Sequence, residues 1–187
     1  MGTLSYTVTM SLDGYAADAS GDFQWTAPGE EVFDFHVERM ALESTEVLGS
    51  NTYRLMTYWE AEPEGEEWGD AEREFARRWQ ALDRVVASST LGPDDLGAGD
   101  PRLVRRLDLA ELDRIVADAA GEVEIFGPTV AAAAIRAGLV RDFRFFIVPR
   151  IVGGGLRALP DDADLALELV EQRLFENGVV YLHYRSR

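Results

Sequence analysis

Alternating apolar and polar residues open the chain and predict a β-strand over residues 3–11. After a loop that begins at Asp13-Gly14, apolar residues recur every three or four positions from Glu30 to about Leu42, which predicts a helix. The same patterns predict further strands over residues 46–48, 84–88, 123–126 and 143–152, and further helices over 51–58, 71–82, 109–119 and 129–137. Two last strands, 166–175 and 179–184, are joined through Asn177-Gly178, a strong hairpin signal.

Strands that alternate with helices predict an α/β fold. We expect a doubly wound, mostly parallel sheet with helices on both faces and an antiparallel C-terminal hairpin at its edge. No internal repeat or linker interrupts the pattern, so residues 1–187 are expected to form a single domain. Residues 60–74 hold eight acidic residues and one arginine, which is typical of a solvated loop.

Charge and composition exclude several classes of function. The 34 acidic residues outnumber the 18 basic ones, and a net charge of −16 argues against a nucleic-acid surface and against an anionic membrane face. All 18 basic residues are arginine and cysteine is absent, which excludes lysine Schiff bases, thiol catalysis and zinc–thiolate sites. No apolar stretch is long enough for a membrane span and no basic residue precedes Arg39, so we expect a cytoplasmic protein.

Three predicted strand-to-helix turns carry glycine or hydroxyl residues. In open α/β sheets, ligands bind beyond the carboxyl ends of the strands, where helix N-termini offer N–H groups to phosphates. Each turn alone is more typical of helix capping, but the three together suit a ligand with several phosphates, such as a dinucleotide. No Rossmann or P-loop fingerprint is present. The turn residues are Gly49, Ser50, Asn51 and Thr52; Ser88 and Ser89; and Gly127, Pro128, Thr129 and Val130.

Three residues near the N-terminus are candidates for catalysis, each with a structural alternative. Trp25 either covers a pocket or anchors its loop by burial. Glu30 either faces a cleft as an acid or only complements the helix dipole. Asp13 either points into the cleft or forms an Asx turn before Gly14. We assign both histidines, His36 and His183, to structural or surface positions, and we expect no metal site, since neither has a second ligand nearby in the sequence.

These residues together make the chain resemble a known family. It is similar to the dihydrofolate-reductase-like family that includes the reductase domain of the bifunctional riboflavin-biosynthesis deaminase-reductase, and most of all to stand-alone actinobacterial members. The likeness covers nearly the whole chain and is carried by residues 11–14, 25–32, 48–53, 75–79, 127–130, 137–140, 148–155 and 175–181.

The resemblance implies an NADPH-dependent oxidoreductase, with NADH as the alternative donor, that transfers hydride to a small heteroaromatic or carbonyl substrate. It implies that the turns at 49–52 and 127–130 grip the pyrophosphate, and that Ser88 and Ser89 lie near the adenosine ribose. It places Trp25 in the loop over the nicotinamide and Glu30 at the substrate.

Two of the departures from the family pattern remove a positive charge. Ser50 and Ser89 stand where relatives carry arginine, so both cations expected near the 2′-phosphate are missing. We therefore expect only weak preference for NADPH, about tenfold or less, with Arg54 and Arg84 as possible substitutes.

The sequence thus supports two functions, a reductase and a non-catalytic nucleotide- or flavin-binding homologue. It also predicts a homodimer, because the apolar C-terminal hairpin lies at a sheet edge.

Overall fold

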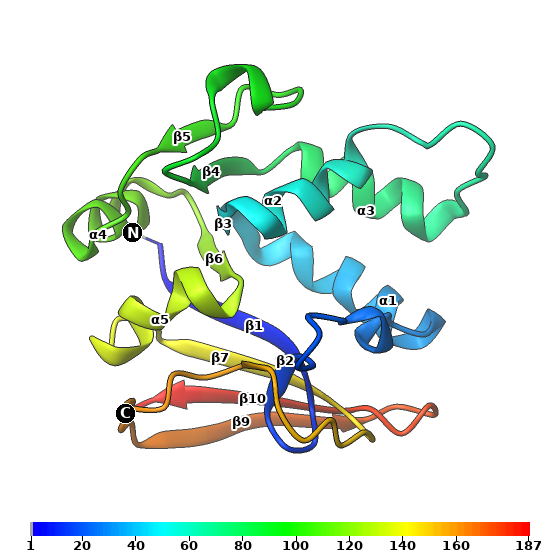
Figure 1. Ribbon diagram of the computed structural model, residues 1–187, viewed down its shortest axis with the longest axis vertical. Helices are drawn as coiled ribbons and strands as arrows, with labels where there is room; N and C mark the ends of the chain where they lie inside the picture. Colours follow the sequence, from blue (N-terminus) through cyan, green and yellow to red (C-terminus); the bar gives the residue numbers. More distant parts are fainter. Residues whose placement is uncertain (1) are drawn as a thin grey trace.

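A mixed sheet of eight strands runs through the molecule, and helices cover both of its faces (Figure 1). The computed structural model describes residues 2–187. The strand order is β5-β4-β3-β6-β1-β7-β10-β9; the strands from β5 to β7 are parallel, and β10 is antiparallel to both of its neighbours. The predicted fold class is therefore confirmed, including the antiparallel hairpin at the edge.

The elements follow one another closely along the chain. The strands are β1 Leu4–Ser11, β2 Tyr15–Ala17, β3 Glu43–Gly49, β4 Asp83–Ala87, β5 Arg102–Val104, β6 Glu122–Phe126, β7 Asp142–Val148, β8 Leu156–Arg157, β9 Leu167–Leu174 and β10 Val180–Ser186. The α-helices are α1 Glu30–Arg39, α2 Ser50–Met56, α3 Asp70–Gln80, α4 Leu109–Asp118 and α5 Pro128–Arg136.

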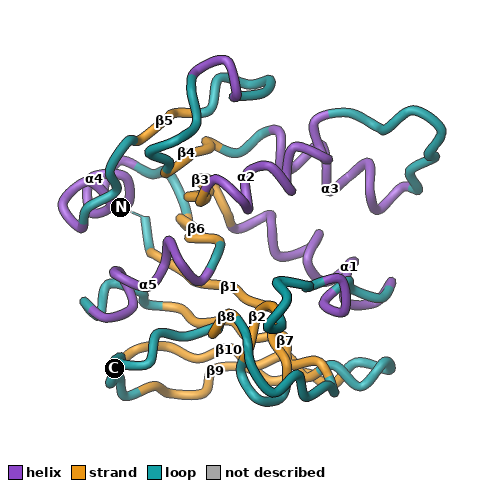
Figure 2. The backbone as a smooth tube through the Cα atoms, viewed as in Figure 1, coloured by secondary structure: helices purple, strands orange, loops and turns teal. Residues whose placement is uncertain are grey.

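The observed elements differ from the predicted ones in three places. The strand predicted over 143–152 ends at Val148, because Pro149 has no N–H for a ladder and the Arg150 N–H turns back to the Val148 carbonyl at 2.8 Å. Strand β5 extends the sheet beyond β4 and was not predicted. Strands β2 and β8 form a separate two-stranded sheet near the carboxyl end of β1, also unpredicted (Figure 2).

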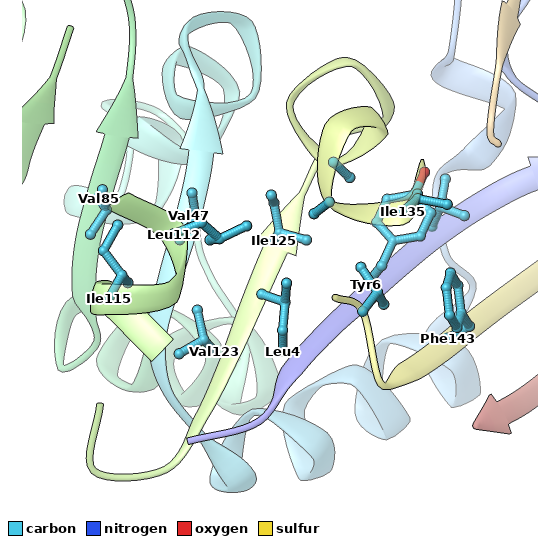
Figure 3. Close-up of a cluster of buried hydrophobic side chains, with 14 of the residues drawn as sticks. Leu4, Tyr6, Val47, Val85, Leu112, Ile115, Val123, Ile125, Ile135 and Phe143 are labelled. Atoms are coloured by element: carbon cyan, nitrogen blue, oxygen red, sulfur yellow. The ribbon is translucent and has the colours of Figure 1, made fainter. Parts of the chain in front are cut away.

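One face of the large sheet is apolar and packs against α4 and α5. Successive residues of a strand point to opposite faces, so every second side chain of the central strands enters this core. Figure 3 shows side chains of β1, β3, β4, β6 and β7 meeting those of the two helices. Its labelled members are Leu4, Tyr6, Val47, Val85, Leu112, Ile115, Val123, Ile125, Ile135 and Phe143.

The opposite face, covered by α1, α2 and α3, holds two separate apolar clusters. One lies around Leu48 and Trp79 over β3 and β4, and the other lies around Phe146 and Tyr181 over β7 and β10. Between them, β6 and β1 present polar side chains such as Glu124 and Thr7. The interruption of the apolar core leaves room for a cavity above the centre of the sheet.

Among the described residues, no helix is long and apolar enough to cross a membrane.

Candidate active site

Two of the predicted ligand-binding turns lie next to each other at the carboxyl edge of the sheet. Strands β3 and β6 are neighbours, paired from Glu43 to Leu48, so the β3–α2 and β6–α5 turns meet. They line one hollow of about 330 Å³ that contains eight of the ten predicted cofactor residues: Gly49, Ser50, Asn51, Thr52, Gly127, Pro128, Thr129 and Val130. The remaining two, Ser88 and Ser89, do not line it.

The turns have the features of a phosphate cradle. Gly49 and Gly127 precede α2 and α5, and neither helix start has a side-chain cap, so N–H groups there are free for a ligand. Gly127 has φ 117°, and a Cβ added to it would lie 2.9 Å from Thr52 Oγ1, so glycine allows the two turns to approach closely. Pro128 has no N–H, which leaves Thr129 and Val130 as the backbone donors of α5. This donor set fits the pyrophosphate of a dinucleotide.

The third predicted turn is held by its own serine. Ser88 is buried, and its Oγ accepts the N–H groups of Thr90 at 3.2 Å and Leu91 at 3.0 Å, whereas Ser89 is exposed. Arg105 follows β5 and donates to the Leu91 carbonyl, which places a guanidinium at this turn. The prediction missed Arg105 because it missed β5; the Arg105-Arg106 pair after a short apolar run was the available signal.

Arg84, in contrast, is not near this turn. It is buried on the α3 side of the sheet, where its guanidinium lies 4.5 Å from the Trp79 ring and donates to the Ala98 carbonyl at 2.7 Å. The expectation that Arg84 supplies a cation for the cofactor is therefore wrong, because an inward-pointing residue at the start of β4 cannot reach the carboxyl edge.

A second cavity, of about 250 Å³, lies between the apolar clusters of the α1–α3 face. Four aromatic side chains line it: Phe33, Trp59, Phe75 and Phe126. Phe33 stacks on both Trp59 and Phe75, with ring centroids 5.8 and 5.4 Å apart. Phe126 precedes Gly127, so the cavity and the phosphate cradle are adjacent on the same strand. Such walls suit a flat apolar ring.

The floor of this cavity is polar and rich in carboxyls. Glu43, Glu46 and Glu124 line it together with Thr7 and Arg39. The Trp79 Nε1 donates to Glu46 Oε2 at 2.7 Å, and burial, with the nearby charge of Glu124, raises the pKa of Glu46 to about 8. Burial and contact with Glu124 also raise the pKa of Glu43 well above its ordinary value. Glu46 is therefore largely protonated at neutral pH.

His36 also lines this cavity, contrary to its predicted structural or surface role. Its ring lies on Phe146, with centroids 4.2 Å apart, and burial lowers its pKa to about 4, aided by the charge of Arg39. His36 is therefore a neutral imidazole at physiological pH. His183 is structural as expected: it is buried, and its Nε2 lies 2.7 Å from Asp142 Oδ1.

The three predicted catalytic residues lie outside both cavities. Glu30 begins α1, is exposed, and lines a shallow hollow with Glu31 and Asn177. The residues of α1 that line the aromatic cavity start at Phe33, one turn further along the helix. The geometry therefore gives Glu30 the dipole-complementing role that was its structural alternative.

Trp25 and Asp13 hold loops together. The Trp25 indole donates to the Asp22 carbonyl at 2.9 Å and lies 5.6 Å from the Arg150 guanidinium, while Thr26, its neighbour, reaches the cavity. Asp13 accepts the N–H groups of Val152 at 3.2 Å and Gly153 at 2.7 Å. The Ser11 hydroxyl and these amides lower the pKa of Asp13.

Comparison with known proteins agrees with this geometry. A family model for the RibD C-terminal domain matches residues 3–181. A putative riboflavin biosynthesis protein from Shewanella sp. PV-4 has a similar structure, with a TM-score of 0.76 at 19% identity over 99% of both chains. RibD of Acinetobacter baumannii gives a TM-score of 0.70 at 16% identity; the match covers all of this chain and 58% of that one.

A dihydrofolate reductase from Enterococcus faecalis, solved with NADP(H), gives a TM-score of 0.64 at 16% identity over 99% of this chain and 96% of its own. No curated protein matches the chain. The fold and the two adjacent cavities define a dihydrofolate-reductase-like protein. Because the family model spans almost its entire length, the chain belongs to the RibD C-terminal domain family. Family and fold support a reductase of this type, as the sequence predicts.

Proposed function

We propose that the protein is an NAD(P)H-dependent reductase that transfers hydride to a small heteroaromatic or carbonyl substrate. The observation that carries the proposal is the adjacency of the two cavities: Phe126 lines the aromatic cavity and Gly127 lines the phosphate cradle. A dinucleotide held in the cradle has its reactive ring next to a substrate held between the aromatic walls.

The cofactor site would be formed by the two glycine turns. The N–H groups at the starts of α2 and α5 would hold the pyrophosphate, with the hydroxyls of Ser50, Thr52 and Thr129 as further donors. The Ser88–Leu91 turn, with Arg105 beside it, would receive the adenosine ribose. When bound, a reduced nicotinamide supplies the hydride; the residues described here supply position and environment.

The aromatic cavity would bind and orient the substrate. Phe33, Trp59 and Phe75 exclude water from the reacting atoms, which strengthens every polar contact within the cavity. Protonated Glu46 can donate a hydrogen bond to the substrate, and neutral His36 can accept one.

A second candidate is a nucleotide-binding homologue without catalysis. The observation that favours it is the lack of cations in the cradle: Ser50 stands where the family resemblance implies arginine, and among the described residues no basic side chain lines the hollow. Arginine is the usual partner of phosphates, so neutral donors alone give weaker binding.

Two measurements separate the candidates. The first measurement is a titration with NADPH and with NADH that follows the protein fluorescence and tests cofactor binding. The second is an assay of a panel of heteroaromatic and carbonyl compounds, in which turnover is followed as the loss of NADPH absorbance at about 340 nm. Binding with NADPH oxidation supports the reductase. Binding with no turnover on any substrate supports the second candidate, and absence of binding of both NADPH and NADH contradicts the reductase.

A further inference from the structure

The inner end of the aromatic cavity holds three carboxyls on two neighbouring strands. Glu43 and Glu46 belong to β3 and Glu124 belongs to β6, and Glu46 and Glu124 are paired in register. Two of the side chains are deeply placed, since Glu46 is 4% exposed and Glu124 is 8% exposed, and Glu43 is half-buried. Three acids this close disfavour full ionisation unless a positive charge joins them.

Each basic group around this cluster has an acidic or polar neighbour, although Nη2 of Arg39 and Nε and Nη1 of Arg84 make no hydrogen bond among the described residues. Arg144 makes a bidentate pair with Glu122, and Arg39 donates to Tyr181 Oη at 3.2 Å and lies 4.0 Å from Glu122. Arg84, next to Glu46 in register, donates to the Ala98 carbonyl and lies 3.9 Å from Glu60. The charged and titratable groups around the three carboxyls are therefore Glu122, Arg39, Arg84, Arg144 and the neutral imidazole of His36.

Thr7 gives an independent sign that a polar ligand group belongs here. Its side chain lines the same cavity and is 8% exposed, yet Oγ1 has no hydrogen-bond partner among the described residues. Buried hydroxyls are almost always paired, so an unpaired one at a cavity wall points to a bound ligand as its partner.

We propose that the inner end of this cavity is a subsite for a cationic nitrogen group carried by a flat apolar ring. The carboxylates of Glu46 and Glu124 would receive its N–H donors and the Thr7 hydroxyl would complete the set, while Phe33, Trp59 and Phe75 would hold the ring. A phosphate or carboxylate is disfavoured here, because three acids lie around the subsite and repel an anion when they are ionised. The inference rests on the proposed function only in taking this cavity as the substrate site.

Proton release follows from the same arrangement. Burial and mutual repulsion raise the pKa of Glu43 and of Glu46, so the empty site carries protons at neutral pH. An entering cation favours the ionised carboxylates and displaces these protons. Binding should therefore strengthen as the pH rises through the pKa of Glu46, about 8.

Three isosteric probes test the subsite without a cofactor: benzamidine (cationic), benzamide (neutral) and benzoate (anionic). Calorimetry of the full chain near neutral pH, in two buffers of different ionisation enthalpy, gives affinity and proton release together. We expect benzamidine to bind about tenfold or more tightly than either analogue, with release of a proton, and Glu46→Gln to remove that preference. Glu38→Gln, on the exposed side of α1, is the matched control and should behave like the unaltered chain.

Equal or tighter binding of benzamide or benzoate, or a benzamidine affinity unaffected by Glu46→Gln, would overturn the proposal. If Glu46→Gln fails to fold, Glu124→Gln and Thr7→Val test the same subsite from β6 and β1. An NADPH titration of the same samples separates the two proposals. Binding of benzamidine without binding of NADPH contradicts only the reductase. Binding of NADPH without a preference for benzamidine contradicts only the subsite.

Discussion

At the scale of single residues, burial moves the pKa of Glu46 far from its value in water, to about 8. Its carboxyl is almost fully buried, and it keeps one strong contact, the hydrogen bond from Trp79. A raised pKa means that the folded chain holds a proton that the unfolded chain releases at lower pH.

This linkage predicts a pH-dependent stability. The pKa of Glu46 is 4.5 unfolded and about 8 folded, so between these values the unfolding free energy falls as pH rises, by up to about 1.4 kcal/mol per pH unit. Glu46→Gln removes this titration and retains a carbonyl for Trp79. Urea unfolding at about pH 5.5 and about pH 8 should show a smaller difference for the variant than for the unaltered chain. Identical differences for the two proteins would contradict the assignment.

Arg105 gives the residue-scale prediction for cofactor choice. Its guanidinium lies at the Ser88–Leu91 turn, where the family resemblance places the 2′-phosphate. If it contacts that phosphate, Arg105→Ala should weaken NADPH binding by about tenfold and leave NADH binding almost unchanged. Arg114→Ala, exposed on α4, is the control. Calorimetry with both cofactors decides the matter: an equal loss for NADPH and NADH would show that Arg105 only supports the turn.

At the scale of elements, the site depends on two similar strand-to-helix units. Glu46-Val47-Leu48-Gly49 leads into α2 and Glu124-Ile125-Phe126-Gly127 leads into α5. Each unit places a carboxyl in the cavity and, three residues later, a glycine in the phosphate cradle.

The two glycines should differ in their tolerance of a side chain. Gly127→Ala forces an L-residue to φ 117° and a Cβ to within 2.9 Å of Thr52 Oγ1, so we expect a loss of about 1–3 kcal/mol in stability. Gly49→Ala meets only Val130 at 3.8 Å and should cost less than about 1 kcal/mol. Thermal unfolding of both variants measures the difference. Equal stability of the two variants would contradict this account of the β6–α5 turn.

The sequence predicted the long elements well and the short ones poorly. Helices α4 and α5 have clear periodicity, and Gly138 ends α5 as expected, with φ 68°. Strand β5 has three residues, too few to show alternation, and its place depends on pairing with β4. Without β5, Arg105 could not be placed at the cofactor turn.

Only the part of the candidate site that is formed by backbone groups, the two glycine turns, was predicted from the sequence. The glycine turns follow from local sequence, because phosphate binding at helix starts needs little else. The acidic floor depends on strand register, which aligns Glu46 with Glu124 across 78 positions of sequence. The repeated Glu-apolar-apolar-Gly pattern was the available signal, but a lone glutamate in a strand usually faces solvent.

At the scale of the whole molecule, strand β9 is the exposed edge of the sheet. Every residue from Glu168 to Leu174 is exposed, and Leu174 reaches 72%. Unprotected apolar edge strands pair readily with other chains.

We therefore keep the expectation of a homodimer, through β9. Light scattering of the unaltered chain should give twice the chain mass of 20.8 kDa. The Val170→Lys variant should give the mass of the monomer. Glu168→Lys, on the same strand, changes charge without removing apolar area and is the control. A monomer of the unaltered chain at micromolar concentration would contradict the prediction.

The spacing within the β3 and β6 units also sets a length. Three residues of extended strand span about 10 Å, so the carboxyl floor and the glycine turns lie roughly that far apart along each strand. Under the proposed function, the nicotinamide end of the dinucleotide and the substrate lie between the glycine turns and the carboxyls, so together they must fill that span. A reducible compound shorter than the cavity would leave a gap between the reacting atoms, and a longer one would push the dinucleotide out of its turns. Under the proposed function, this span limits the size of the substrate that the cavity can accept.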